Sequence, residues 1–169
     1  KPVGASAEKK LKVEPPKIDG FEVQFEWQGD QGKWVRFTKK FNKLLTEEYN
    51  KGKKQVELVV PTGATLMINF EKMIQKNKKT GYQRRIRVAL RSDKDTDFNV
   101  LEWQDKNNTW NPYPIQNSIQ LEQIFQSGSQ LGVIKSPPNS SNSEEIDLNK
   151  MTSTNLKSKL FTSIRRQNP

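Results

Sequence analysis

The ten residues FEWQGDQGKW at positions 25–34 return almost unchanged as LEWQDKNNTW at positions 101–110. Counting forward by 76 residues aligns a Glu-Trp-Gln triplet and a second tryptophan in the two stretches. The separation becomes 78 residues farther along, where Met73 matches Met151. Two residues have therefore been inserted, and the Pro/Ser/Asn-rich segment 136–145 is the kind of surface loop that tolerates an insertion. The pattern indicates a duplicated unit.

Each copy has the pattern of a small curved sheet with one helix. Residues 21–28 alternate apolar and polar side chains, as a half-buried strand does, and residues 29–32 form a turn. Apolar residues at helical spacing predict a helix that ends near Gly52, and the last strand falls within 81–90. The expected class is α+β, with two consecutive modules that are each a curved antiparallel half-barrel sheet cradling one α-helix. We expect the four tryptophans to fill the two cores or to pack on the hairpins.

Four segments are expected along the chain. They are a disordered basic leader over 1–20, a first module over 21–91, a linker over 92–97 and a second module over 98–167. The leader mixes Lys, Pro, Ala and Glu without periodicity, so it offers little apolar surface to bury.

The composition excludes several kinds of chemistry. The chain has no cysteine and no histidine, which removes disulfides, Cys/His zinc sites and the commonest general base. The scattered carboxylates of Asp30, Glu57 and Glu71 do not suggest a paired acid–base site. We therefore expect no catalytic residue, no metal and no cofactor in this sequence, which we take to be part of a longer protein. Because no apolar run approaches the roughly 18 residues of a membrane span, we expect a nuclear or cytoplasmic protein without a membrane partner.

The positive charge is unevenly distributed. Residues 1–20 hold five Lys/Arg against three acids, residues 21–95 hold 17 against nine, and residues 96–169 hold seven against seven. The differences are +2, +8 and 0, so most of the net charge of +10 lies in the first module. This distribution predicts that one copy faces an anion and the other does not.

The order of motifs resembles the WWE domain, a module named after two tryptophans and one glutamate. The resemblance rests on two tryptophans seven residues apart, a helix that closes in YNKGK, and the segment FEKMIQKNKKTGYQRRIR. It covers residues 21–91 well and residues 98–167 more loosely. A tandem of such modules is similar to the arrangement in the Deltex group of ubiquitin ligases, and the family also occurs in other ubiquitin ligases and in ADP-ribosyltransferases.

The resemblance implies a reader of poly(ADP-ribose) that binds the iso-ADP-ribose unit in the cup of the half-barrel. The ligand-binding glutamine and arginine of the family fall on Gln75 and Arg84. Two aromatic residues of the family's pocket are replaced by Leu66 and Gln28. Tyr82 is the candidate for a stacking wall in their place.

Alternation along the last strand supports Arg84 independently of the resemblance. If Ile86 points inward, Tyr82 and Arg84 point inward as well, and Arg85 and Arg87 point to solvent. An arginine on the apolar face of a sheet is costly unless it lines a wet pocket or is paired, and a pyrophosphate suits its planar fork. Arg87 is a further candidate for ligand contact within a basic rim that is either a binding surface or merely solvated. The rim consists of Lys76, Lys78, Lys79, Arg85, Arg87 and Arg91.

The second copy has lost the anion-binding pair. Ser153 and Thr162 stand in place of the glutamine and the arginine, and Glu144 replaces the leucine. We expect the second module to mediate protein contacts, while the first binds poly(ADP-ribose) or an ADP-ribosylated protein and so delivers an attached activity. Two alternatives remain open. One is an assembly subunit with vestigial cups, and the other is nucleic-acid binding through the basic first module.

Overall fold

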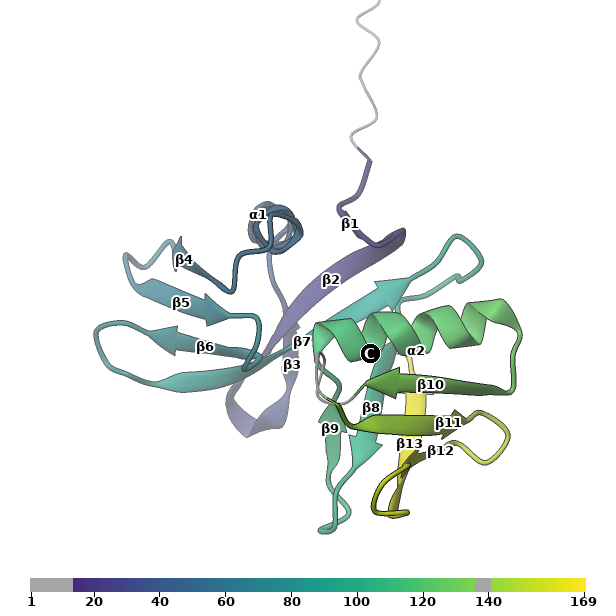
Figure 1. Ribbon diagram of the computed structural model, residues 1–169. Helices are drawn as coiled ribbons and strands as arrows, with labels where there is room; N and C mark the ends of the chain where they lie inside the picture. Colours follow the sequence, from purple (N-terminus) through teal and green to yellow (C-terminus); the bar gives the residue numbers. More distant parts are fainter. Residues whose placement is uncertain (1–13, 136–140) are drawn as a thin grey trace, which may run out of the picture.

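The computed structural model describes residues 14–135 and 141–169. Two expectations lie partly outside these residues: the leader over residues 1–13 and the insertion within residues 136–140. Figure 1 shows two modules side by side, each with one helix against a curled sheet. The predicted α+β class with two half-barrel modules is confirmed. Within the described residues, neither helix has the length and apolar character needed to cross a membrane.

The first module contains a seven-stranded antiparallel sheet in the order β1-β2-β7-β6-β5-β4, with β3 paired to β2. Helix α1 lies between β3 and β4 in the chain. The elements are β1 (Lys17–Ile18), β2 (Phe21–Gln28), the 3-10 turn η1 (Asp30–Gly32), β3 (Trp34–Arg36), α1 (Lys39–Asn50), β4 (Gln55–Val59), β5 (Thr65–Asn69), β6 (Ile74–Asn77) and β7 (Gln83–Arg91).

The second module repeats this plan with a six-stranded sheet in the order β10-β11-β12-β13-β8-β9. The pairing register repeats as well, because Trp27 lies opposite Ile86 and Trp103 lies opposite Ile164. The structural repeat therefore extends to individual residue pairs. The elements are β8 (Val100–Gln104), β9 (Trp110–Pro112), α2 (Ile115–Ser127), β10 (Leu131–Lys135), β11 (Ser143–Asp147), β12 (Thr152–Asn155) and β13 (Phe161–Gln167).

Helix α1 ends where the sequence predicts, and a capping threonine precedes it. The Thr38 hydroxyl accepts a hydrogen bond from the backbone of the first turn, and Gly52 follows the helix at φ +79°, a conformation that favours glycine. Leu45 is fully buried, and its apolar neighbours on the same helix face pack against the core. The sequence did not reveal the role of Asn42, whose amide bonds to both the N–H of Phe25 and the C=O of Val23 and so fastens α1 to β2.

The first module begins earlier than predicted. Lys17 and Ile18 pair with Glu22 and Phe21 as a short edge strand, and Ile18 is only 1% exposed. A single isoleucine in a Lys/Pro-rich context gives no periodic signal. The predicted leader over 1–20 therefore included four residues too many. Residues 17–20 belong to the fold.

The two modules share apolar surface. Ile115 and Ile119 of α2 are buried in the core cluster of the first module, together with residues of β2 and β7. The backbones also meet, because Leu90 and Asn99 exchange hydrogen bonds of 2.8 and 2.9 Å. The junction is therefore an extension of the core of the first module, and the two modules are packed tightly against each other.

A chain of buried charges runs through the same junction. Arg87 is 5% exposed, and its Nε lies 2.7 Å from Glu26 of its own module, while its Nη1 lies 3.7 Å from Glu102 of the other. Glu102 in turn accepts a 2.6 Å bond from Arg165. Arg87 stacks over the Trp34 ring at 4.3 Å. The expectation that Arg87 points to solvent is wrong, since the second module covers that face of β7 and supplies a carboxylate partner.

Replacing Arg87 tests whether this charge chain holds the junction. Arg87→Leu leaves two buried carboxylates short of a partner, and we expect the free energy of unfolding to fall by about 3–5 kcal/mol. Arg36→Leu is the matched control because Arg36 pairs with the same Glu26 from the surface, at 3.8 Å; its loss should cost less than about 1 kcal/mol. Denaturant unfolding followed by tryptophan fluorescence measures both. Equal, small losses would show that the junction does not depend on Arg87.

Helix–sheet packing differs between the copies at one matched pair. In the second module, a Cβ on Gly132 would lie 2.4 Å from Cδ1 and 2.7 Å from Cγ1 of Ile124. The equivalent first-module residues, 76 positions earlier, are Val56 and Glu48. The larger apolar side chain is on the strand in the first module and on the helix in the second. Gly132 is therefore required because Ile124 approaches its backbone closely.

Gly132→Ala should destabilise the protein by about 1–3 kcal/mol, because the added methyl group overpacks the contact with Ile124. Gly132→Ala combined with Ile124→Ala should lose less stability than the sum of the two single changes. A double-mutant cycle by thermal unfolding measures this coupling. Strict additivity would contradict the packing account.

Candidate functional site

A hollow of about 420 Å³ opens on the inner side of β5, β6 and β7. Gln75 of β6 pairs directly with Arg84 of β7 across the sheet, and Ile68 of β5 pairs with Gln75 from the other side. Because side chains alternate along strands, this row of residues shares one face. We call this cavity the first-module hollow. Its lining residues are Leu66, Gln75, Asn77, Thr80, Tyr82 and Arg84.

Gln75 carries an unsatisfied polar atom into this region. The side chain is 7% exposed, and its Oε1 has no hydrogen-bond partner in the described part of the chain. A buried amide oxygen without a partner costs stability, so such atoms in folded proteins call for an explanation.

Arg84 is held between two aromatic rings. Its guanidinium carbon lies 5.4 Å from the Trp27 ring centre and 5.0 Å from that of Tyr82. Nη1 donates to the backbone oxygen of Gln28 at 3.3 Å and lies 2.9 Å from Oδ1 of Asp30. Nε and Nη2 make no hydrogen bond within residues 14–135 and 141–169. Part of the guanidinium fork is thus left free while the rest is fixed.

The ion pair with Asp30 was not foreseen from the sequence. Asp30 belongs to η1 and is 82% exposed on its side chain, whereas Arg84 is largely covered. An exposed carboxylate on a turn gains little from pairing, since water screens it. Asp30 is therefore a replaceable partner of Arg84, and the hollow beside the pair is not filled by apolar side chains.

Tyr82 lies at the rim and is 59% exposed. Its ring contacts the guanidinium of Arg84, and Leu66 faces the same hollow from β5. The structure thus brings together three of the four predicted site residues, namely Gln75, Tyr82 and Arg84. The fourth, Arg87, lies on the opposite face of β7 among the junction charges and cannot reach this hollow.

The tryptophans have two structural roles. Trp27 and Trp103 pack against the two cores, as predicted. Trp34 and Trp110 each lie 4.3 Å from a guanidinium, that of Arg87 and of Arg165 respectively. Each of these arginines also bonds to the glutamate of the Glu-Trp-Gln triplet, so the conserved spacing within the repeat builds one Trp–Arg–Glu unit per module.

The cup of the second module contains a different network. The Ser153 hydroxyl donates to Glu144 at 2.6 Å, at the positions equivalent to Gln75 and Leu66. Burial raises the pKa of the neighbouring Tyr113, the Glu144 charge adds to this effect, and a hydrogen bond with Ser153 opposes it. The serine and carboxylate satisfy each other, in contrast to the unpaired amide in the first module.

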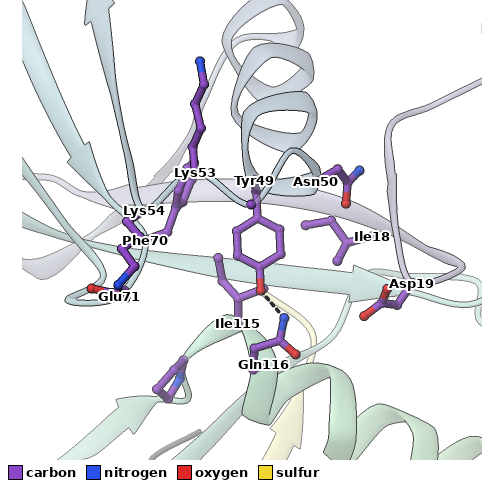
Figure 2. A pocket seen from close by; sticks show the side chains of 12 residues that line it. Ile18, Asp19, Tyr49, Asn50, Lys53, Lys54, Phe70, Glu71, Ile115 and Gln116 are labelled. Atoms are coloured by element: carbon purple, nitrogen blue, oxygen red, sulfur yellow. Dashed lines mark hydrogen bonds and ion pairs between the residues drawn. The ribbon is translucent and has the colours of Figure 1, made fainter. Parts of the chain in front are cut away.

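A larger hollow of about 610 Å³ lies at the junction of the modules (Figure 2). Tyr49 reaches down from α1, and its hydroxyl accepts a hydrogen bond from Gln116 of α2. Lys54 and Glu71 pair with each other at its edge, 3.1 Å apart. The chargeable groups of this cavity are largely paired or exposed, and none of the predicted site residues lies in it. Within the described residues there is no cluster of three potential metal-ligating His, Cys, Asp or Glu side chains.

Comparison of the sequence with known protein families also finds two copies of one domain. The family profile described as WWE domain matches residues 23–88 and again residues 100–166. A search of curated proteins gives no match. The two matched segments span β2 to β7 and β8 to β13, and together they cover well over half of the chain. The chain therefore belongs to the WWE family and carries two consecutive WWE domains.

Proposed function

We propose that the first module binds the iso-ADP-ribose unit of poly(ADP-ribose), free or attached to a protein, in the first-module hollow. WWE domains are non-catalytic interaction modules that often bind ligands related to poly(ADP-ribose). One observation carries the proposal for this chain: the unpartnered Oε1 of Gln75 lies beside Arg84 on the neighbouring strand. A ligand with a hydrogen-bond donor and a diphosphate would satisfy both groups.

The chemistry of each side chain in the hollow suggests which part of the ligand it would contact. The free N–H groups of Arg84 suit the oxygens of a diphosphate, because a guanidinium binds two anionic oxygens at once. Tyr82 and Leu66 offer an aromatic and an aliphatic surface for a flat base. Gln75 can accept from the base or from a ribose hydroxyl.

Asp30 makes the proposed binding selective and modest in strength. A diphosphate approaching Arg84 meets the carboxylate that already pairs with its Nη1 at 2.9 Å. The ligand must displace that carboxylate or share the guanidinium with it, and like charges at this distance repel. A ligand that gains only the contact with Arg84 would therefore bind weakly, whereas one that also satisfies Gln75 gains a second interaction.

The second module is proposed to contact a protein, through which an attached activity would be brought to its target. Support comes from large apolar side chains that are exposed on β10, in the β12–β13 turn and at the start of β13. Val133 and Phe161 lie in one cross-strand row, separated only by Glu145 and Thr154. Clustered exposed apolar residues commonly mark protein contacts. The exposed members are Leu131, Val133, Leu156, Leu160 and Phe161.

Nucleic-acid binding is less well supported, because much of the positive charge of the first module is already paired. Arg87 is buried against two glutamates, and Arg91 lies 2.5 Å from Glu22. A nucleic-acid face needs free cations, and its affinity would fall steeply with salt, without base preference. A pure assembly role, with both cups vestigial, would leave the unpaired amide of Gln75 unexplained.

Isothermal titration calorimetry with iso-ADP-ribose tests the proposed site. We expect saturable heat, with Arg84→Ala weakening binding by about ten- to a hundredfold because a charged hydrogen bond contributes about 1.5–3 kcal/mol. Gln75→Ala should weaken it as well. Plain ADP-ribose should bind less tightly than iso-ADP-ribose.

The second module supplies matched controls for this titration. Thr162→Ala and Ser153→Ala alter the residues equivalent to Arg84 and Gln75, and neither should change the measured affinity. Far-UV circular dichroism and thermal unfolding confirm that each variant is folded. Absence of saturable heat, or heat that neither first-module change alters, would rule out the site.

A second prediction separates the proposed role of Gln75 from stability. Gln75→Met removes the unpaired oxygen while keeping the shape of the side chain, so the free energy of unfolding should stay equal or rise by up to about 1 kcal/mol while ligand binding is lost. Gln24→Met is the comparison, since the Gln24 amide donates to Phe25 O at 2.7 Å and to Phe37 O at 3.3 Å. That change should lower stability. A large destabilisation by Gln75→Met would show that its amide is a structural group.

A further inference from the structure

A second hollow, of about 460 Å³, adjoins the first-module hollow. Asn77 and Thr80 line both cavities, so the β6–β7 turn is their common wall. The other side of the second hollow is formed by Gly63, Ala64 and Thr65 at the β4–β5 turn, where small side chains leave room. We call this second cavity the turn hollow. The two turns that line it lie at the end of the sheet away from the second module (Figure 1).

Two lysines project from the wall that the hollows share. Lys78 lies 2.6 Å from Glu57, and both side chains are about half exposed. Lys79 has neither an ion pair nor a side-chain hydrogen bond in the described part of the chain. A half-exposed pair is worth little in water, so an incoming anion can compete for Lys78, while Lys79 is free for one.

The turn that carries these lysines is held in a defined shape. Oδ1 of Asn77 accepts from the N–H groups of Lys79 and Thr80 at 2.9 and 3.1 Å. The N–H of Lys78 bonds to Thr65 O at 3.0 Å, which ties the turn to β5. The lysines are thereby kept at a fixed position relative to Tyr82, whose backbone closes the same turn by accepting from Asn77 N at 2.9 Å.

We propose that the turn hollow is a second phosphate-binding subsite, which receives the neighbouring unit of a polymeric ADP-ribose chain through Lys78 and Lys79. This inference rests on the proposed binding of iso-ADP-ribose in the first-module hollow. A single unit fills only that hollow, whereas a polymer that continues past Thr80 presents its next diphosphate to two ammonium groups. The module thus distinguishes chains from single units by linking two adjacent sites, which multiplies their affinities.

The second module offers an internal comparison at the same place in the fold. The residues equivalent to Glu57 and Lys78 are Val133 and Leu156, 76 and 78 positions later in the chain. An ion pair in one copy is replaced by two apolar side chains in the other. The Glu57–Lys78 pair therefore accompanies the Gln75–Arg84 pair and is lost together with it, while Lys157, which is equivalent to Lys79, keeps one cation in the second turn.

The test compares one iso-ADP-ribose unit with a purified oligomer of several units, by calorimetry or fluorescence anisotropy at fixed salt. For the unmodified chain, the oligomer should bind at least about tenfold more tightly than the single unit. The double change Lys78→Ala and Lys79→Ala should remove most of this gain and leave affinity for the single unit within about twofold. Lys76→Ala is the matched control, because Lys76 is an exposed lysine on β6 that lines neither hollow.

A gain-of-affinity variant guards against a folding artefact. Glu57→Gln removes the competing carboxylate from Lys78, so it should tighten binding of the oligomer without changing that of the single unit. The inference is overturned if the single unit binds but the oligomer binds no more tightly. It is also overturned if Lys76→Ala has the same effect as the double change, or if single-stranded RNA of equal phosphate number binds as well as the oligomer. Failure of the single unit to bind would instead refute the proposed function itself.

Discussion

The fold depends on the charge chain that joins Glu26, Arg87, Glu102 and Arg165 beneath two tryptophan rings. Glu26, Arg87 and Glu102 are buried, and buried charges are tolerated only with partners in good geometry. Each module supplies one arginine and one glutamate, and the 3.7 Å contact between Arg87 and Glu102 crosses the junction. Strand β7 is thereby divided by alternation: its odd-numbered arginines face the second module, and Arg84 remains on the inner face. Alternation along β7 thus leaves Arg84 for the hollow, while the junction supplies a partner for Arg87.

The repeat, the half-buried strands and the helix end at Gly52 could be predicted because each is a local pattern. The inward direction of Arg84 also followed from alternation alone. The burial of Arg87 could not be predicted, because its partners Glu26 and Glu102 lie 61 and 15 residues away along the chain and in different modules. A basic strand gives the same sequence signal whether water or a second module covers it. The ion pair of Arg84 with Asp30 was missed for a similar reason, since only the pairing of β2 with β7 brings them together.

Comparison of the two modules shows which differences the scaffold tolerates. At the helix–sheet contact, Val56 and Glu48 have become Gly132 and Ile124, so volume moved from one element to the other with little change in the fold. In the cup, an amide and an arginine have become a serine and a threonine, and the serine bonds to Glu144 at 2.6 Å. The first kind of change conserves packing, whereas the second changes the chemistry offered to a ligand. The scaffold is shared, and the inner surfaces have diverged.

The placement of Ile115 and Ile119 in the core of the first module has a consequence for inheritance. A gene segment that encoded only the first copy would produce a domain with exposed apolar surface where Ile115 and Ile119 pack, and with Arg87 paired to Glu26 alone. One that encoded only the second would expose two isoleucines of its helix to water. The shared core therefore favours inheritance of the two copies as one unit.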